Sequence, residues 1–152
     1  DGTGISPSEI EDIRQRPRLR VLWTDASARI ASFQQGVDGY EGTRDTLLRH
    51  TQPETPLVTS DVLWADWPDG AGTNSMHSLI RFEDVFGGET GRIPLNARIE
   101  MALLDLPSVG TDNMGDGGAF HRMLQAWDDT TATWNSLENG IQACKNADTK
   151  VA

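Results

Sequence analysis

The sequence has little of what several protein classes require. Its 152 residues include a single cysteine, Cys144, so no disulfide bond can form within the chain. No apolar run approaches the roughly 20 residues that a membrane-spanning helix needs. The formal net charge is −10, which argues against nucleic acid as the main partner, because a phosphate backbone requires a basic surface. We therefore expect no membrane insertion and no nucleic-acid partner.

Motifs of known catalytic classes are also missing. The sequence contains no G-x-S-x-G, no H-E-x-x-H and no P-loop. His50, His77 and His121 lie in separate segments, and none has the spacing of a metal site. Adjacent acids such as Asp128 and Asp129 are most often solvated turn residues. We therefore expect no active site within the chain and predict that the protein is not an enzyme.

The residues that are present indicate a folded β protein. Charged residues make up 24% and hydrophobic residues 37% of the chain, a globular balance, and the length suits one domain. Short segments of alternating hydrophobicity are separated by loops rich in Gly, Pro, Asn and Asp, the pattern of β-strands. In 97–106 this alternation favours a strand over a helix. The predicted strands cover residues 16–23, 30–36, 43–49, 77–82 and 97–106. The sequence predicts an all-β fold, an antiparallel β-sandwich.

A tryptophan-rich stretch, 120–135, predicts a corner of two strands and a turn. Trp127 and Trp134 flank the acidic pair Asp128 and Asp129, whose side chains can cap a turn. The segment 131–134 combines threonine with tryptophan, and both favour strands. By composition alone, the two tryptophans anchor a sandwich core.

Two features of the sequence suit ligands, and each has an ordinary structural alternative. Asp38, Glu41 and Asp45 offer the oxygen ligands that calcium prefers, although composition alone favours a tight hairpin turn at Asp38-Gly39 with ordinary surface acids. Trp64 and Trp67 lie in a long irregular stretch, 50–75, where exposed aromatic rings can stack on sugars. The alternative is that these two tryptophans close the end of the core.

Four segments, in order, resemble the DNRLRE-type (disaggregatase-related) carbohydrate-binding module family. They are FQQGVDGYEGTRDT (33–46), SLIRF (78–82), IPLNARIEMALL (93–104) and WDDTTATWN (127–135), and together they cover about residues 28–136. Asp129 stands where the family pattern has a glutamate, and the 50–75 stretch is longer than the pattern suggests. The resemblance implies a jelly-roll-like β-sandwich, secretion, and non-catalytic polysaccharide binding, with calcium in some members.

The resemblance also predicts an unusual domain organisation. Residues 8–23 are similar to the closing segment of the family, yet they stand at the beginning of the chain. Residues 1–27 therefore resemble the end of a preceding module, and residues 28–152 a module that is incomplete at its C-terminus. We predict that the strand 16–23 pairs with a different module or chain through Leu19, Val21 and Trp23, which gives a homo-oligomer or filament. The alternative is an excised window on tandem modules.

The predicted function is a non-catalytic module, extracellular or at the cell surface, that binds polysaccharide. Trp64 and Trp67 would stack on the sugar, and Arg49 and Arg81 would pair with the carboxylates of an acidic glycan. Calcium at Asp38, Glu41 and Asp45 would accompany it. The alternatives are a structural subunit or repeat of an extracellular filament assembled by strand addition, and an accessory part of a larger hydrolase.

Overall fold

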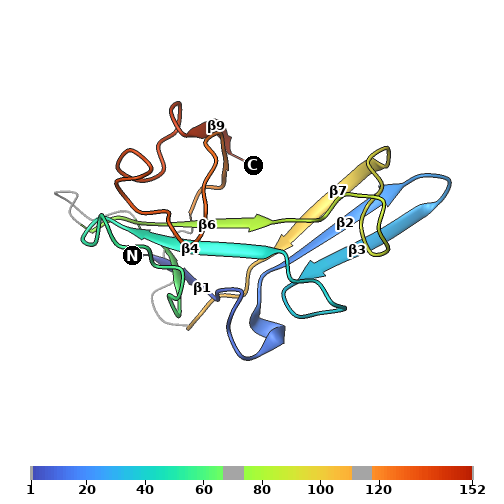
Figure 1. Ribbon diagram of the computed structural model, residues 1–152, viewed down its shortest axis with the longest axis horizontal. Coiled ribbons are helices and arrows are strands. Elements are labelled where there is room, and N and C mark those ends of the chain that lie inside the picture. The colour runs from blue at the N-terminus through green and yellow to red at the C-terminus, as the bar shows by residue number, and fades with distance from the viewer. Residues whose placement is uncertain (1, 67–73, 111–117, 152) are drawn as a thin grey trace. The chain divides into compact units, whose positions relative to one another are not determined.

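The regular structure of this chain is almost entirely β-strand (Figure 1). The computed structural model describes residues 2–66, 74–110 and 118–151. The strands are β1 (Thr3–Ile5), β2 (Arg18–Thr24), β3 (Ala28–Gln34), β4 (Thr43–Arg49), β5 (Leu63–Ala65), β6 (Met76–Phe82), β7 (Arg98–Asp105), β8 (His121–Met123) and β9 (Ala147–Val151). One short 3-10 helix, η1 (Ile13–Gln15), precedes β2. Within these ranges there is no α-helix, and no helix is long and apolar enough to cross a membrane.

The strands form several small antiparallel sheets. One sheet has three strands in the order β3-β2-β7, and the pairs β4–β6, β1–β5 and β8–β9 form two-stranded sheets. The pairings of β1 with β5, of β2 with β3 and β7, and of β8 with β9 are antiparallel. The predicted all-β class is therefore confirmed. The packing of these sheets into a jelly-roll-like sandwich stays a prediction.

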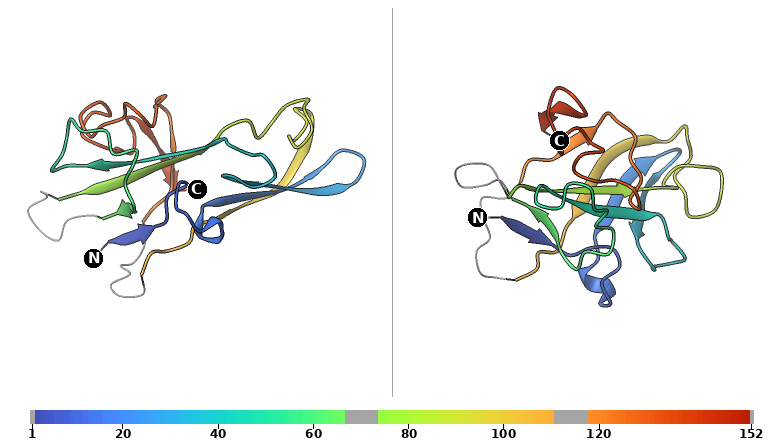
Figure 2. Two further views of the ribbon diagram at one scale, coloured as in Figure 1. Left: turned by 60° about the horizontal axis from the view of Figure 1, so that its bottom comes forward. Right: turned by 60° about the vertical axis from the view of Figure 1, so that its left-hand side comes forward.

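The chain divides into two compact units, each with its own core (Figure 2). Unit 1 consists of Asp1–Pro7, Asp45–Leu79 and Ser108–Ala152, and unit 2 of Ser8–Arg44 and Ile80–Pro107. The core of unit 1 contains Leu48, Leu79, Ala132, Trp134 and Leu137. The core of unit 2 contains Val21, Trp23, Phe33, Val85 and Ile93. The predicted domain boundary after residue 27 falls in the turn between β2 and β3, and both strands belong to unit 2.

In unit 2, β2 covers most of the segment predicted to pair with another module or chain, and it is the central strand of a sheet. β2 pairs with β3 along its whole length and with β7 on its other edge. Val21 and Trp23 are buried in the unit 2 core, and Leu19 packs against it. The prediction that residues 16–23 pair with another module or chain is therefore wrong. Both backbone edges of β2 and its apolar face are already satisfied within the chain.

The short segment after β2 makes this internal pairing feasible. Thr24 pairs with Ala28, so residues 25–27 form a hairpin turn rather than a linker. The Asp25 carboxylate accepts hydrogen bonds from the backbone N–H groups of Ala26 and Ser27, at 2.5 and 3.2 Å. Such an Asx turn reverses the chain within a few residues. The turn therefore brings β3 directly alongside β2.

The Asp38-Gly39 turn forms as predicted, but the strand after it takes a different partner. Asp38 and Gly39 have φ of 51° and 78°, and Tyr40 N donates to Val37 O at 2.9 Å, which defines a type I′ turn. β4 then pairs with β6 and does not return along β3. At Gly42 the chain passes so close to Glu83 that an added Cβ would lie 2.6 Å from the Glu83 carbonyl oxygen.

In unit 1, the tryptophan-rich corner is mostly turns. β8 ends at Met123, and residues 129–138 form turns except at 132 and 133, so the predicted second strand at 131–134 is absent. The reason is local: the Asp128 carbonyl accepts from Thr131 N at 3.3 Å and from Ala132 N at 2.8 Å. These bonds close a turn where a strand would need extended backbone. Trp134 is still buried, so the expected core anchor is confirmed for this tryptophan.

Candidate functional site

The turns of the corner form an open pocket of about 400 Å³ that lies wholly within unit 1. Ala132 and Leu137 are buried, and Trp127 is half-buried, so these three form an apolar floor. Exposed polar residues form the rim. The lining residues are Gln125, Ala126, Trp127, Asp128, Thr131, Ala132, Ser136 and Leu137. We call this cavity the corner pocket. An apolar floor with a few polar groups is typical of small-ligand sites.

Asp128 organises the turn on one side of the corner pocket. Its Oδ1 atom accepts from Thr130 N at 3.1 Å, from Thr130 Oγ1 at 2.5 Å and from Thr131 Oγ1 at 3.2 Å. These hydrogen bonds, chiefly those from Thr130, lower the pKa of the Asp128 carboxyl below its usual value. The side chain is therefore an ionised carboxylate at neutral pH. Within the described parts of the chain, Oδ2 accepts no hydrogen bond, and the Asp128 side chain is exposed in the pocket lining.

The floor of the corner pocket is fixed by the unit 1 core. Trp127 packs against the buried cluster that includes Trp134 and Leu137. The buried Asn146 side chain donates from Nδ2 to the Leu137 and Gly140 carbonyls, at 2.6 and 2.8 Å. These contacts hold the pocket walls in place before any ligand arrives, which lowers the entropic cost of binding.

The Ser136 hydroxyl on the rim has a structural role. It accepts from Thr133 N at 2.8 Å and donates to Thr133 O at 3.1 Å. The Thr133 hydroxyl in turn accepts from Ser136 N at 3.1 Å. Ser136 therefore spends its donor on the turn, which leaves Gln125 and Asp128 as the rim side chains best placed to recognise a ligand.

Of the residues predicted to bind carbohydrate, the three that the structure describes, Trp64, Arg49 and Arg81, do not line the corner pocket. Trp64 is half-buried in β5, where its ring would lie 3.3 Å from a Cβ added at Gly4 of the paired strand. Arg49 ends β4, and its Nη1 lies 3.5 Å from Gln52 Oε1. Trp67 lies outside the described residues. Trp64 and Arg49 belong to unit 1 but Arg81 to unit 2, and their role in binding stays a prediction.

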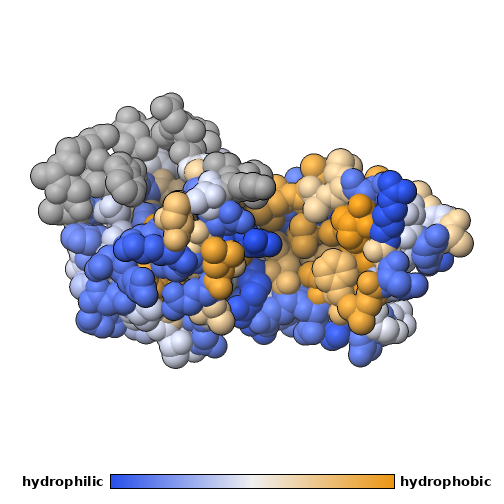
Figure 3. Space-filling view, turned by 90° about the horizontal axis from the view of Figure 1, so that it is seen from above, coloured by the Kyte–Doolittle hydropathy of each residue, from blue (hydrophilic) through white to orange (hydrophobic). Residues whose placement is uncertain are grey.

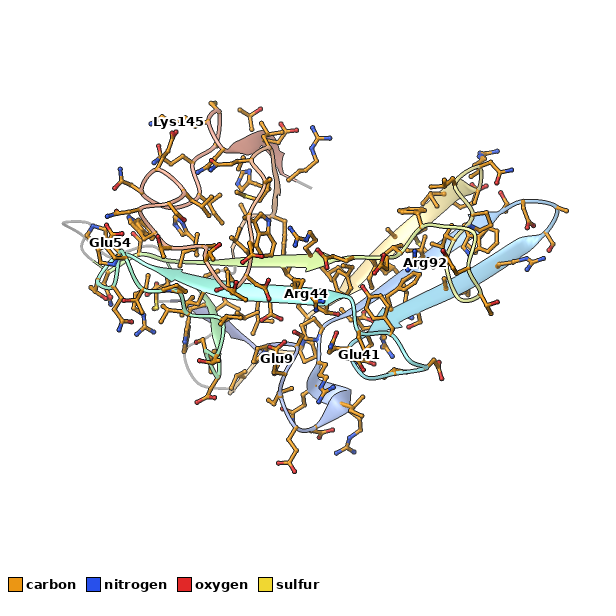
Figure 4. The ribbon with its side chains drawn as sticks, in the orientation of Figure 1. Glu9, Glu41, Arg44, Glu54, Arg92 and Lys145 are labelled. Carbon is orange, nitrogen blue, oxygen red and sulfur yellow. The ribbon has the colours of Figure 1, made fainter. Side chains whose placement is uncertain are left out.

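Arg81 lines a second cavity, an open groove of about 570 Å³ that lies wholly within unit 2. Its guanidinium pairs with Glu83 at 2.6 Å, and Arg44, which is labelled in Figure 4, pairs with the same carboxylate at 3.4 Å. The rest of the lining is mainly apolar: Leu19, Val21, Ile80, Phe82, Asp84, Val85, Phe86, Ile99, Ala102 and Leu104 complete it. Figure 3 shows apolar side chains gathered over this part of the surface. We call this cavity the sheet groove.

The structure does not gather the predicted calcium ligands into a recognisable site. Asp38 and Glu41 are exposed in unit 2, and the Glu41 carboxylate accepts from Gln35 Nε2 (Figure 4). Asp45 is 2% exposed and belongs to unit 1. Among the described residues, no three His, Cys, Asp or Glu side chains are placed to hold a metal ion. Calcium binding stays a prediction, which a melting experiment with added calcium and with chelator tests.

Sequence reasoning assigned no ligand-binding role to Gln125, Trp127 or Asp128. One signal in the sequence could have indicated them: Gln125-Ala126-Trp127-Asp128 places an amide, an indole and a carboxylate within four residues. The pattern was interpreted as a core corner, which is true of Trp134 but only partly of Trp127.

Comparisons of the chain with family models, with curated proteins and with solved structures found no match.

Proposed function

We propose that this chain is a non-catalytic carbohydrate-binding module and that the corner pocket is its binding site. The observation that carries the proposal is the pocket's composition: an indole and two buried apolar side chains beneath an amide and an ionised carboxylate. Sugar rings present an apolar C–H face and a polar edge of hydroxyls. An indole matches the first of these, and amide and carboxylate groups match the second.

The size of the pocket supports the same proposal. About 400 Å³ lies at the lower end of the roughly 300–1,000 Å³ typical of small-molecule sites. Such a volume suits one or two sugar units of a longer polymer. The extracellular setting rests on the family resemblance alone, whereas the absence of catalysis rests on the missing catalytic motifs and on that resemblance.

Calorimetric titration of soluble polysaccharides against three variants tests the proposal. Gln125→Ala and Asp128→Asn alter exposed rim residues, so folding should persist while affinity falls. Trp64→Ala serves as the matched control, because Trp64 is also a half-buried tryptophan of unit 1 but lies outside the pocket lining. If Trp64→Ala lost binding while the rim variants bound normally, the site would lie at Trp64 and not in the corner pocket.

Trp127→Phe completes the design. It keeps an aromatic ring in the pocket and in the unit 1 core, so it should fold, but its smaller ring covers less of a sugar. We expect several-fold weaker binding with a nearly unchanged melting temperature. A variant that binds as well as the parent would show that the indole makes no contact with the sugar.

The filament alternative loses its donor strand in this structure. Residues 16–23 are held between β3 and β7, so strand addition through Leu19, Val21 and Trp23 would require the core of unit 2 to open. We do not propose assembly through these residues.

A further inference from the structure

We propose that the glycan bound in the corner pocket is neutral, and that a sugar hydroxyl donates to Asp128 Oδ2. This inference rests on the proposed function and names its ligand class. It differs from the acidic glycan suggested by the pairing of Arg49 and Arg81 with uronates. Three observations carry it: the charge of the lining, the hydrogen bonds of Asp128, and the charge of unit 1.

Among the described residues that line the corner pocket, one is charged, and it is negative. None of these described lining residues is an arginine or a lysine. A carboxylate ligand recognised in a protein site normally finds an arginine fork or a lysine ammonium. A uronate in this pocket would meet the exposed Asp128 carboxylate instead, and like charges at close range repel.

The hydrogen bonds of Asp128 make it an acceptor rather than a neutral acid. Thr130 and Thr131 saturate Oδ1 and lower the pKa of the carboxyl, so the group holds no proton to donate to a ligand. Oδ2 therefore requires a donor from the ligand. Sugar hydroxyls are donors, and a hydrogen bond to an ionised acceptor is stronger than one between neutral groups.

The net charge of unit 1 also disfavours an anionic ligand. Unit 1 contains twelve acidic and four basic residues, a formal charge of −8, whereas unit 2 contains eleven and nine, a formal charge of −2. A polyanion approaching the corner pocket meets this negative field, which slows its association at low salt. The association of a neutral polymer is not slowed by this field.

One cation near the rim is the strongest counter-argument. The Asn146 carbonyl accepts from Gln125 N at 3.3 Å, which places Lys145 one residue from a contact with the rim. Lys145 is not part of the pocket lining, and it lies in the turn before β9 (Figure 4). Lys145→Ala therefore belongs in the experiment, because it removes a nearby cation that could attract a uronate.

The test uses the whole chain and three probes: a soluble neutral glucan or galactomannan, polygalacturonate, and a glucosamine polymer. We expect the neutral probe to bind and polygalacturonate to bind at least about 10-fold more weakly. Affinity for the neutral probe should change less than about twofold between low and high salt, because salt screens only charge–charge attraction. The glucosamine polymer is cationic. The inference would be overturned in favour of a cationic ligand if this polymer bound with strong salt dependence and still bound more tightly than the neutral probe at high salt.

Asp128→Asn and Asp129→Asn form the matched pair. Both remove one charge from the same turn, but only Asp128 lines the pocket. Asn at 128 keeps an oxygen for Thr130 and Thr131 and replaces Oδ2 with a donor. Binding of the neutral probe should fall about 10-fold or more in Asp128→Asn and less than about twofold in Asp129→Asn. The difference in affinity between the neutral probe and polygalacturonate should become smaller in Asp128→Asn only.

The outcomes separate this inference from the proposed function. Polygalacturonate binding tighter than the neutral probe, and lost in Gln125→Ala or Lys145→Ala, would refute the neutral ligand and keep the binding site. Neutral binding that Asp128→Asn leaves intact would refute the role of Oδ2. Absence of binding to all three probes would contradict the proposed function itself.

Discussion

The corner pocket of unit 1 and the sheet groove of unit 2 are cavities of comparable size with different chemistry. The corner pocket measures about 400 Å³ and has a polar rim, and the sheet groove measures about 570 Å³ and is mainly apolar. The cores beneath them differ as well. Unit 2 builds its core on a three-stranded sheet, whereas the core of unit 1 combines Trp134 and Leu137, which stand in turns, with Leu48 of β4 and Leu79 of β6.

This difference shows how local structure determines the polarity of a cavity. Turns need side-chain acceptors for their unpaired backbone N–H groups, so Asp128 stands beside the corner pocket for a structural reason and becomes available to a ligand. A sheet satisfies its own backbone and presents only alternating side chains. The apolar face of β2 therefore gives the sheet groove its apolar floor through Leu19 and Val21.

The largest expected effects come from removing one core residue in each unit. Trp23→Ala should cost about 3–5 kcal/mol of unfolding free energy and Leu137→Ala about 2–5 kcal/mol, because each leaves a buried cavity. Only Leu137→Ala removes part of the floor of the corner pocket, so only this variant should also weaken glycan binding. Denaturant unfolding and calorimetry measure the two effects.

The control for these variants is Ile30→Ala. Ile30 lies on the same sheet as Trp23 but is 75% exposed. Its loss should change stability by less than about 0.5 kcal/mol. A cost near that of Trp23→Ala would mean that Ile30 is covered in solution, and the division between a buried and an exposed face of the sheet would fail.

A smaller effect is expected at the close approach in unit 2. A Cβ at Gly42 would lie 2.6 Å from the Glu83 carbonyl oxygen, and backbone cannot move aside as a flexible side chain can. Gly42→Ala should therefore cost about 1–3 kcal/mol. Gly88→Ala is the matched control, since nothing lies within 4 Å of its added Cβ. Equal melting temperatures for the two variants would contradict this account of Gly42.

Much of the sheet in unit 2 could be predicted from the sequence. Alternating residues located β2 and β7. In β2 the alternation reflects burial, because Val21 and Trp23 lie in the unit 2 core, whereas the β7 residues 98–104 are all exposed. The Asp38-Gly39 turn was predictable because few residue pairs accept positive φ at both positions. The partner of β2 was not predictable. Alternation shows which face of a strand is buried but not which strands lie at its edges.

The candidate site was less accessible to prediction than the sheet. Threonine and tryptophan favour strands, so 131–134 was predicted to be extended, yet the hydrogen bonds of the Asp128 carbonyl fold it into a turn. Without that turn there is no corner pocket, and Trp127 cannot be assigned to a cavity. Local backbone hydrogen bonding, not strand propensity, decides this segment.

Acidification should destabilise unit 1 through His77. His77 Nδ1 accepts a hydrogen bond from Ile141 N at 2.9 Å, its ring lies 4.9 Å from the Trp134 ring, and burial lowers its pKa below 6.5. The folded state then holds the neutral form while the unfolded chain takes up a proton. This contribution to stability is full above pH 6.5 and is lost as the pH falls through that value to the lowered pKa of the folded state.

Melting temperatures measured against pH test this linkage. His77→Gln keeps a side-chain acceptor but cannot titrate in this range. Its melting temperature should fall less than that of the parent between neutral and mildly acidic pH. His50 lies on the same tryptophan, with ring centroids 5.3 Å apart, so His50→Gln is the second variant to compare. An unchanged pH profile in His77→Gln would assign the titration elsewhere.

The smallest expected effect concerns the ion pairs on the exposed face of the unit 2 sheet. Asp105 pairs with Arg18 and Arg20 at 3.0 Å each, but all three side chains are 35–43% exposed. Hydrogen bonds from Arg20, and then from Arg18, lower the pKa of the Asp105 carboxyl. The stabilisation is therefore present above its usual pKa of 3.8 and is lost as the pH falls through the folded-state value. Solvent screens such pairs, so Asp105→Asn should cost less than about 1 kcal/mol, and high salt should reduce the cost further.

Asp25→Asn offers a contrast, since Asp25 accepts from two backbone N–H groups of the β2–β3 turn, a role that salt does not screen. A salt-independent loss in Asp105→Asn as large as that in Asp25→Asn would show that Asp105 positions β7 against β2 and does not act as a surface charge alone.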